Sequence, residues 1–293
     1  MFAPCEDVST PLGPRVGLPG IVAPIRNFGS RRSANVRPFL ALLWFWLLAM
    51  GQPASQAVDS EAFSAGAISS GERFLAELFD PGLDLLPEYA GAKVYWLYHD
   101  NYLAAKLLKP SHPALAKRIE TAMHSFGVSH SGKIEILFNQ ATNAFPFRNY
   151  ELLDVTNIAG KLIRTERVTE KVLKGWDAYA DLLFMGAIAK STSAPEEAKR
   201  YFEKGLALWD GRGFADPAFK KGNLYASYKL ALAILAADVL KQKLPFRSDA
   251  LQQLRKLQSS TGGWITDYSQ DGQPHGLANV ETTCLVLMAL HTH

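Results

Sequence analysis

The sequence predicts an all-α fold: an α/α toroid, built as an incomplete ring of about four pairs of outer and inner helices. Four segments have apolar residues at helical spacing on one face only, which is typical of outer, half-exposed helices: residues 61–79, 112–126, 194–209 and 248–258. Four others are apolar nearly all round, as in fully buried helices: residues 101–108, 178–189, 225–240 and 281–290. The two kinds alternate along the chain, which an ordinary helical bundle, the rival interpretation, does not require.

Local signals support individual helices of this pattern. The segment 194–209 is preceded by Ser193-Ala194-Pro195-Glu196, which matches the capping box that marks a helix start. Leu251, Leu254 and Leu257 form the apolar stripe of the last outer helix. The helix pattern is therefore clearest in the second half of the chain.

Residues 131–167 break the helix pattern. They contain KIEILF and YELLDVTNIAGKLIRTE, two runs that favour strands, on either side of FPFRN. We expect a small hairpin or strand pair inserted here into the second helix pair.

The first 57 residues have the features of a leader with an export signal. Arginines precede the apolar run at 39–50, and small residues follow it, as in a secretory signal. The run is too short for a membrane span, which needs roughly 20 residues. We expect cleavage after Ala57, a single domain over 58–293, and a periplasmic or secreted protein exported by the Sec or the twin-arginine route. An uncleaved N-terminal anchor is the alternative.

The charge balance bears on the partners. Residues 1–57 hold five Arg against Glu6 and Asp7, so the net charge of +3 lies in the leader and the rest of the chain is neutral. A neutral domain offers no electrostatic reason to expect a nucleic-acid partner. Cys284 is the only cysteine after the leader, so the domain forms no internal disulfide. We predict no cofactor, and no membrane span after cleavage.

One motif resembles a known family. Gln258, Gly262 and Trp264 stand as Q-x-x-x-G-x-W, with Leu254 four residues before the glutamine and an inner-helix pattern after the tryptophan. This resembles the QW repeat of squalene cyclases and protein prenyltransferases, the terpenoid cyclase-like superfamily, in which the motif joins an outer to an inner helix of an α/α toroid. A second match, at residues 211–216, lacks the glutamine.

The resemblance implies a scaffold rather than a reaction. The acidic D-x-D-D motif of the cyclases is absent, as is the C-G-E-Q thioester of the complement-type toroids. The zinc ligands of the prenyltransferases have no counterpart, because Cys284 lies in the apolar part of its helix. Other toroids of this general shape bind and cut polysaccharides in bacterial envelopes, which agrees with the predicted export.

Candidate site residues follow from the expected ring. Its inner helices begin at one end, so their leading loops, which are rich in polar and aromatic residues, converge there. Aromatic side chains beside carboxylates at the mouth of a cavity are suited to holding a sugar ring or a hydrophobic substrate. The candidate catalytic acids are Asp100, Asp267, Glu281 and Asp181. The candidate substrate-binding residues are Tyr98, His99, Asp177, Tyr225, Tyr228, Trp264, Tyr268 and His275.

Several of these residues also have a structural interpretation. Asn279 is a natural N-cap, and Glu281 in the first helical turn complements the helix dipole. Trp264 can fill the gap between helices without any site role. Asp181 lies in an apolar sequence, where a buried partner such as Lys229 or Lys106 would explain it without catalysis.

The segment Asp267–Gly272 reads D-x-S-x-D-G, which is the first half of a calcium loop. Ala278 stands where the loop needs its bidentate Glu, so an Asx/Gly turn is the favoured interpretation. We predict no metal site.

The leading hypothesis is an exported carbohydrate-active protein, a hydrolase or a lyase, with a small-molecule or glycan ligand in the cleft. Two carboxyls from different loops would share the general acid and base roles. The alternatives are a non-catalytic binding or assembly module, and a cyclase-like protein that binds a terpenoid or lipid.

Overall fold

The structure is a computed structural model that describes residues 63, 65–129, 133–138 and 145–291. These residues belong to one compact unit within Ser60–His293. The predicted leader, with its export signal and cleavage position, lies outside the described residues. Within the described part of the chain, no helix combines the length and the apolar character that crossing a membrane requires.

Four helices are half-exposed, and they lie where the one-sided pattern predicts them. Each buries only one stripe of its surface, such as Ala116, Ile119 and Met123 in the second of them. Their bounds are α1 Ala65–Glu77, α3 Pro113–Ser125, α5 Pro195–Leu206 and α8 Arg247–Lys256.

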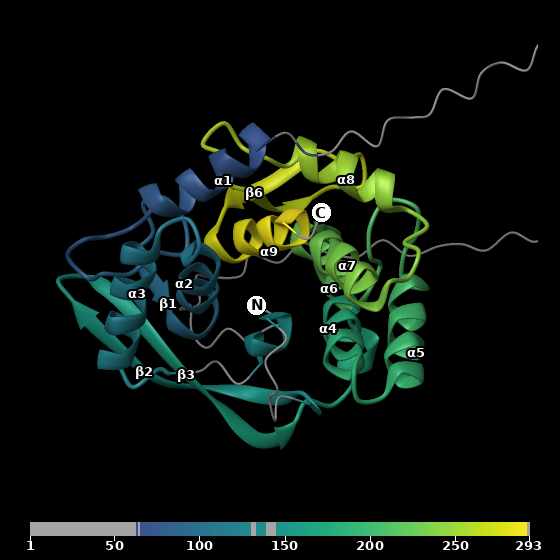
Figure 1. Cartoon of the computed structure of the whole chain (residues 1–293), viewed down its shortest axis with the longest axis horizontal. Coiled ribbons are helices and arrows are strands. Elements are labelled where there is room, and N and C mark those ends of the chain that lie inside the picture. The colour runs from purple at the N-terminus through teal and green to yellow at the C-terminus, as the bar shows by residue number, and fades with distance from the viewer. Residues whose placement is uncertain (1–62, 64, 130–132, 139–144, 292–293) are drawn as a thin grey trace, which may run out of the picture. The chain divides into compact units, whose positions relative to one another are not determined.

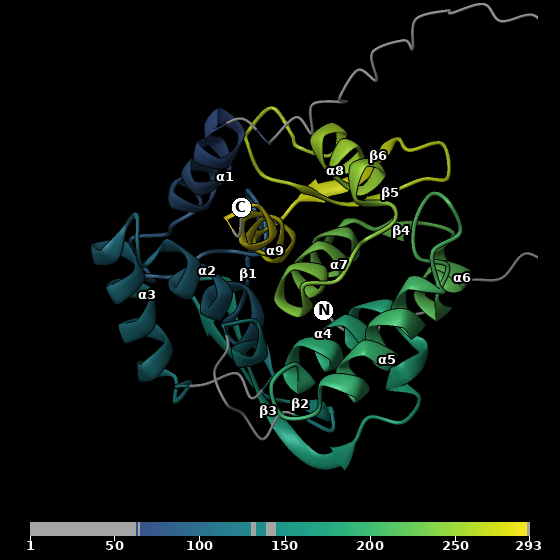
Figure 2. The same ribbon diagram turned by 45° about the vertical axis from the view of Figure 1, so that its right-hand side comes forward.

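Four other helices are buried nearly all round, and they form the core. They are α2 Tyr102–Leu108, α4 Ala180–Lys190, α7 Ser227–Leu240 and α9 Val280–His291. Helix α9 contacts α2 and α7, and α7 contacts α4, while α3 packs on α2 and α5 on α4 (Figures 1 and 2). Because each buried helix has neighbours on several sides, its sequence lacks a polar face.

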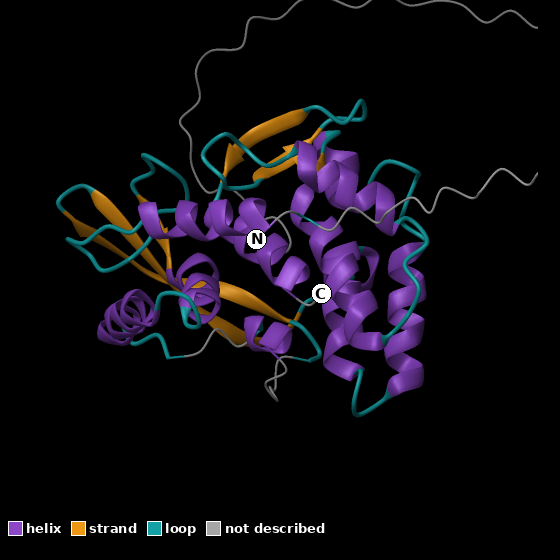
Figure 3. Cartoon of the chain, turned by 45° about the horizontal axis from the view of Figure 1, so that its top comes forward, coloured by secondary structure: helices purple, strands orange, loops and turns teal. Residues whose placement is uncertain are grey.

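The prediction of an all-α toroid is wrong. The described residues are about 52% helical with 18% strand, a mixed α/β structure, and they form two three-stranded sheets (Figure 3). Most of the missed strands have two to five residues and lie in the loops that lead into the buried helices. Strands that short leave too few alternating residues to be seen as a period of two.

The first sheet has the strand order β1-β3-β2. β2 (Arg148–Ile158) and β3 (Lys161–Val172) form an antiparallel hairpin, and β1 (Val94–Trp96) pairs parallel to β3. The strand pair expected near 131–167 is therefore present, but it lies further along the chain. The run KIEILF does not join it, because residues Ile134–Phe138 form the 3-10 helix η2.

The second sheet joins three loops in the order β4-β5-β6. β4 (Tyr225–Ala226) directly precedes α7, and β5 (Ile265–Tyr268) and β6 (Pro274–Ala278) form a hairpin before α9. The remaining short elements are η1 (Leu97–Asn101), η3 (Trp176–Ala178) and α6 (Pro217–Gly222). This sheet places the loops before α7 and α9 side by side, with Asp267 paired to Ala226 on one side and His275 on the other.

The Q-x-x-x-G-x-W segment connects α8 to β5 and packs on α1. Gln258 Nε2 donates to the carbonyl oxygens of Ala67, at 2.8 Å, and Gly262, at 2.9 Å. Trp264 is fully buried, and its Nε1 donates to the carbonyl oxygen of Leu254 at 2.9 Å. The motif residues thus have structural roles in this turn.

Candidate functional site

A pocket of about 170 Å³ opens where the loops that lead into α2, α7 and α9 meet. Its side chains come from the segment before β1, from β1 and the π-helical turn η1 (Leu97–Asn101), and from α7, β5 and the start of α9. The lining residues are Glu88, Trp96, His99, Asp100, Tyr228, Thr266, Asp267, Asn279, Glu281 and Thr282.

Two buried asparagines hold this pocket together. The Asn101 amide donates to the carbonyl oxygens of Leu86 and Trp96, both at 3.0 Å, and its Oδ1 accepts from the Leu86 N–H at 2.8 Å. Asn279 caps α9, since its Oδ1 accepts from the Thr282 N–H at 2.9 Å. The Val280 N–H donates to the Glu88 carbonyl oxygen at 3.0 Å, which joins the two walls.

Asp100 is the most perturbed acid of the pocket. Its side chain is 3% exposed, and Oδ2 has no hydrogen-bond partner in the described part of the chain. Burial, and then the charges of Glu281 and Glu88, raise the pKa of Asp100 well above its usual range. Asp100 therefore keeps its proton at pH values at which an exposed carboxyl is ionised.

Asp267 is a second acid with a raised pKa. Burial raises it, while the Thr266 side chain, His275 and Lys229 act in the opposite direction. Glu281 is buried in the first turn of α9, where the helix dipole favours an ionised carboxylate. The pocket thus combines carboxyl groups in different electrostatic environments.

Histidine and aromatic side chains complete the pocket. His99 Nδ1 lies 3.2 Å from Glu166 Oε2, and both residues are buried. The indole of Trp96 donates to Glu88 at 3.4 Å, and the Arg164 guanidinium packs over its ring at 4.5 Å. Glu166 and Arg164 both belong to β3, so this strand contacts the pocket residues His99 and Trp96.

The structure brings five of the predicted site residues to one place: Asp100, His99, Tyr228, Asp267 and Glu281. Asp181 lies behind them, with Oδ1 at 3.7 Å from Lys229 Nζ and Oδ2 accepting from the Tyr228 hydroxyl at 3.3 Å. Lys229 is thus the buried partner that the sequence suggested for it. Asp181 does not line the pocket.

The other predicted site residues lie elsewhere. Asp177 is half-exposed and pairs with Lys204 at 2.5 Å, and His275 is exposed on β6. Tyr225 and Tyr268 are buried, and they donate to Asp210, at 2.5 Å, and to the Arg212 carbonyl oxygen, at 2.9 Å.

Trp264 packs in the core, as described above. Tyr98 is buried, and its pKa is raised by burial and then by the charges of Glu166 and Glu135.

Several residues of the site were not among the candidates. Trp96 stands in the aromatic run before α2, so its position in the sequence could have indicated a site residue. Glu166 lies in a long strand and Glu88 in a segment without periodicity, and neither carries a local signal. The residues concerned are Glu88, Trp96, Glu166, Thr266, Asn279 and Thr282.

Beside the β5–β6 hairpin lies a larger, open hollow of about 530 Å³. Three of its polar side chains make hydrogen bonds within the protein: Gln253 Nε2 donates to the Gly272 carbonyl oxygen at 2.9 Å, and Asp271 accepts from the Ser269 hydroxyl. The D-x-S-x-D-G segment here forms the turn between β5 and β6. Among the described residues, no group of three or more His, Cys, Asp and Glu is arranged to hold a metal ion.

The variant Asp100→Asn is expected to be more stable than the wild type near neutral pH. The pKa of Asp100 is higher in the folded chain than the ordinary 3.8, so between the two values the folded chain binds more protons than the unfolded chain. The free energy of unfolding therefore falls as the pH rises through that window. Asparagine does not ionise, so its advantage is absent below the window, grows as the pH rises through it and is complete above it.

Urea unfolding across this pH range measures the difference, with Asp177→Asn as the matched control. The hydrogen bond from Lys204 lowers the pKa of Asp177, so this carboxylate stabilises the fold above its unfolded pKa. The control should therefore lose stability at neutral pH, where Asp100→Asn gains it. A wild type that is more stable than Asp100→Asn at neutral pH would contradict the electrostatic description of the pocket.

Comparison of the chain with protein-family models gives no match, and searches of curated proteins and of solved structures give none either.

Proposed function

We propose that the chain cleaves a saccharide by general acid–base catalysis in the pocket that Asp100 lines. One observation carries the proposal: a buried carboxyl with a raised pKa and an unpartnered oxygen shares a small pocket with three other carboxyls. Glycoside cleavage needs a protonated carboxyl and an ionised one on opposite sides of the scissile bond.

The environments of the carboxyls suggest their roles. Burial and the charges of Glu281 and Glu88 raise the pKa of Asp100 well above its usual range, which suits a general acid that protonates the leaving oxygen. Glu281 at the start of α9 favours the ionised form and suits the base that activates water or the nucleophile that attacks the sugar carbon. Two carboxyls whose surroundings drive their pKa values apart are a recurrent arrangement for acid–base catalysis.

The size and lining of the pocket suit one sugar ring. Its volume of about 170 Å³ is below that of pockets for drug-sized ligands, which have roughly 300–1,000 Å³. Trp96 and Tyr228 offer aromatic surface, and the side chains of Thr266 and Thr282 offer partners for sugar hydroxyls. We therefore favour cleavage at a terminal sugar of the substrate.

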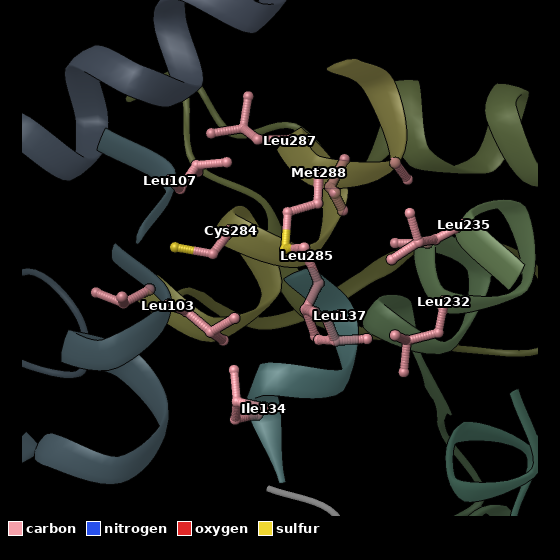
Figure 4. Packing of buried hydrophobic residues seen from close by; sticks show 14 of the residues in the cluster. Leu103, Leu107, Ile134, Leu137, Leu232, Leu235, Cys284, Leu285, Leu287 and Met288 are labelled. Carbon is pink, nitrogen blue, oxygen red and sulfur yellow. The ribbon is translucent and has the colours of Figure 1, made fainter. Parts of the chain in front are cut away.

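The interior between the buried helices does not favour a terpenoid or lipid ligand. Figure 4 shows side chains of α2, α7, α9 and η2, among them Leu103, Leu232, Leu285 and Leu137, filling the space between these elements. The pocket lies instead at the helix N-termini, and most of its lining residues are polar or charged.

The experiment is a screen of oligosaccharides for release of reducing ends, with the wild type, Asp100→Asn and Glu281→Gln. We expect each variant to lose about 10²–10⁴-fold in rate, the usual contribution of a general acid or base. The control Glu196→Gln, which changes an exposed residue of α5, should keep the wild-type rate. A wild type that binds oligosaccharides without cleaving any would favour a binding module, and full activity in both site variants would refute the proposal.

A further inference from the structure

We propose that the ligand of this pocket carries a positively charged amino group, so that the substrate class is a saccharide with a free amine. The saccharide part rests on the proposed function, whereas the amine part stands on the pocket itself. Four of the ten lining residues of the described structure are carboxylic acids: Glu88, Asp100, Asp267 and Glu281. No Lys or Arg is among those ten.

The Lys and Arg side chains near the pocket are not part of its lining. Lys229 donates to Asp216 and lies 3.7 Å from Asp181, and the Arg164 guanidinium packs over the Trp96 ring. Lys133 is buried beside η2, and its charge acts on Glu281. His99 is the one basic side chain of the lining, and it lies against Glu166. The carboxyl groups of the lining therefore exceed its basic groups.

Asp100 gives an independent indication of a ligand. Its Oδ2 is buried and lacks a hydrogen-bond partner in the described structure, although the residue lines the pocket. A buried polar atom without a partner is costly, and a ligand with hydrogen-bonding groups removes that cost. The pocket is thus incomplete without an occupant.

The charges around Asp100 indicate that the occupant is positively charged. Burial and the charges of Glu281 and Glu88 raise the pKa of Asp100, which means that the pocket attracts a proton. The same carboxylates attract an ammonium group that lies among them. Glu88 is its natural partner, because it is half-buried at the pocket and the Trp96 indole donates to its carboxylate only at the long distance of 3.4 Å.

Protonation of Asp100 and binding of the amine oppose each other. An ammonium beside the carboxyls offsets their charge, so it lowers the pKa of Asp100 toward its ordinary value. Asp100 is then a stronger acid in the complex with an amino sugar than in the complex with a neutral sugar. The alkaline limb of the pH–rate profile should accordingly lie at lower pH for substrates that carry the amine.

Isothermal titration calorimetry with glucosamine, glucose, cyclohexylamine and cyclohexanol tests the inference, at a pH at which both amines are protonated. We expect glucosamine to bind at least about tenfold more tightly than glucose, and the difference to shrink with added salt. If cyclohexylamine binds more tightly than cyclohexanol, the amino group itself raises the affinity. If glucosamine binds more tightly than cyclohexylamine, the sugar hydroxyls contribute further affinity.

The variants Glu88→Gln and Asp267→Asn should weaken glucosamine binding about tenfold more than glucose binding, while Glu196→Gln should change neither. Equal affinity for glucosamine and glucose, or equal losses for both in the variants, would overturn the inference. Cleavage of neutral oligosaccharides without any preference for the amine would refute the inference and leave the proposed function standing. Amine binding that depends on Glu88, without cleavage of any saccharide, would support the amine preference of the pocket and refute the proposed function.

Discussion

Lys229→Met is expected to lower the free energy of unfolding by about 3–5 kcal/mol, the cost of leaving buried charges without their partner. Lys229 is 2% exposed, in the first turn of α7. Its ammonium donates to Asp216 and lies 3.7 Å from Asp181, and both carboxylates are 1% exposed. Methionine fills a similar volume but leaves two carboxylates in the core without the ammonium.

The Asp216 carboxylate also has backbone partners, and these connect the ion cluster to neighbouring helices. Its Oδ1 accepts from the N–H groups of Ala218, at 3.0 Å, and Phe219, at 3.3 Å. Its Oδ2 accepts from the Ala180 N–H at 3.2 Å. One ion cluster therefore holds the starts of α4, α6 and α7, and its loss should also disturb Tyr228 in the pocket.

Urea unfolding followed by circular dichroism measures this effect, and Lys199→Met is the matched control. Lys199 lies 3.9 Å from Glu203 on the exposed face of α5, where such a pair contributes about 0.3–0.5 kcal/mol. The triple variant Lys229→Met with Asp181→Asn and Asp216→Asn should recover part of the loss, since it removes the uncompensated charges. A Lys229→Met protein as stable as the Lys199→Met control would show that the buried cluster does not stabilise the fold.

Gly262→Ala is expected to destabilise the chain by roughly 3 kcal/mol, as the sum of a strained backbone and a steric clash. Gly262 has φ +96°, a conformation that side chains with a Cβ rarely adopt. A Cβ there would lie 2.3 Å from the backbone oxygen of Ser70 in α1, and backbone does not move aside as a flexible side chain can. The clash would separate α1 from the turn between α8 and β5.

Gly211→Ala is the matched control for this substitution. Gly211 has the same φ of +96°, but a Cβ there would meet nothing within 4 Å. The control should lose only the backbone contribution, roughly 1–2 kcal/mol. Equal losses in thermal or urea unfolding of the two variants would mean that the contact with Ser70 does not constrain the fold.

The helices could be predicted from the sequence because the signal of a helix is local. A one-sided stripe or a fully apolar run fits within 10 to 14 residues, and the observed α4, α7 and α9 match the predicted inner segments to within two residues at each end. Which helices pack against each other depends on contacts between distant segments, and these contacts have no local signal. The sequence therefore predicted the elements better than the fold class.

The sheets escaped prediction for the same reason. Tyr225 and Ala226 count as a strand only because they pair with Tyr268 and Asp267, more than forty residues further along. β1 is three residues long, and its partner β3 lies beyond two helices. The hairpin of β2 and β3 was the exception, because two adjacent β-favouring runs are themselves a local signal.

The residues of the candidate site also differ in whether a local signal predicts them. The residues that lead directly into buried helices, Asp100 and Glu281, were recognisable because polar groups at such places are unusual in an apolar sequence. Glu88 and Glu166 enter the site through the Tyr89–Asn279 bridge and through pairing of β1 with β3. Neither contact has a signal in the residues that make it.

The sequence by itself determined which helices are buried, where they begin, and that acids and aromatic residues gather at their starts, because each of these depends on the spacing of neighbouring residues. Only the tertiary structure decided which acids share a pocket. In the folded chain Asp181 lies beside Lys229, and Asp177 pairs with Lys204 at the surface. Four other acids line one small pocket: Glu88, Asp100, Asp267 and Glu281. The physical reason is that the protonation and the role of a carboxyl depend on the charges that folding places beside it.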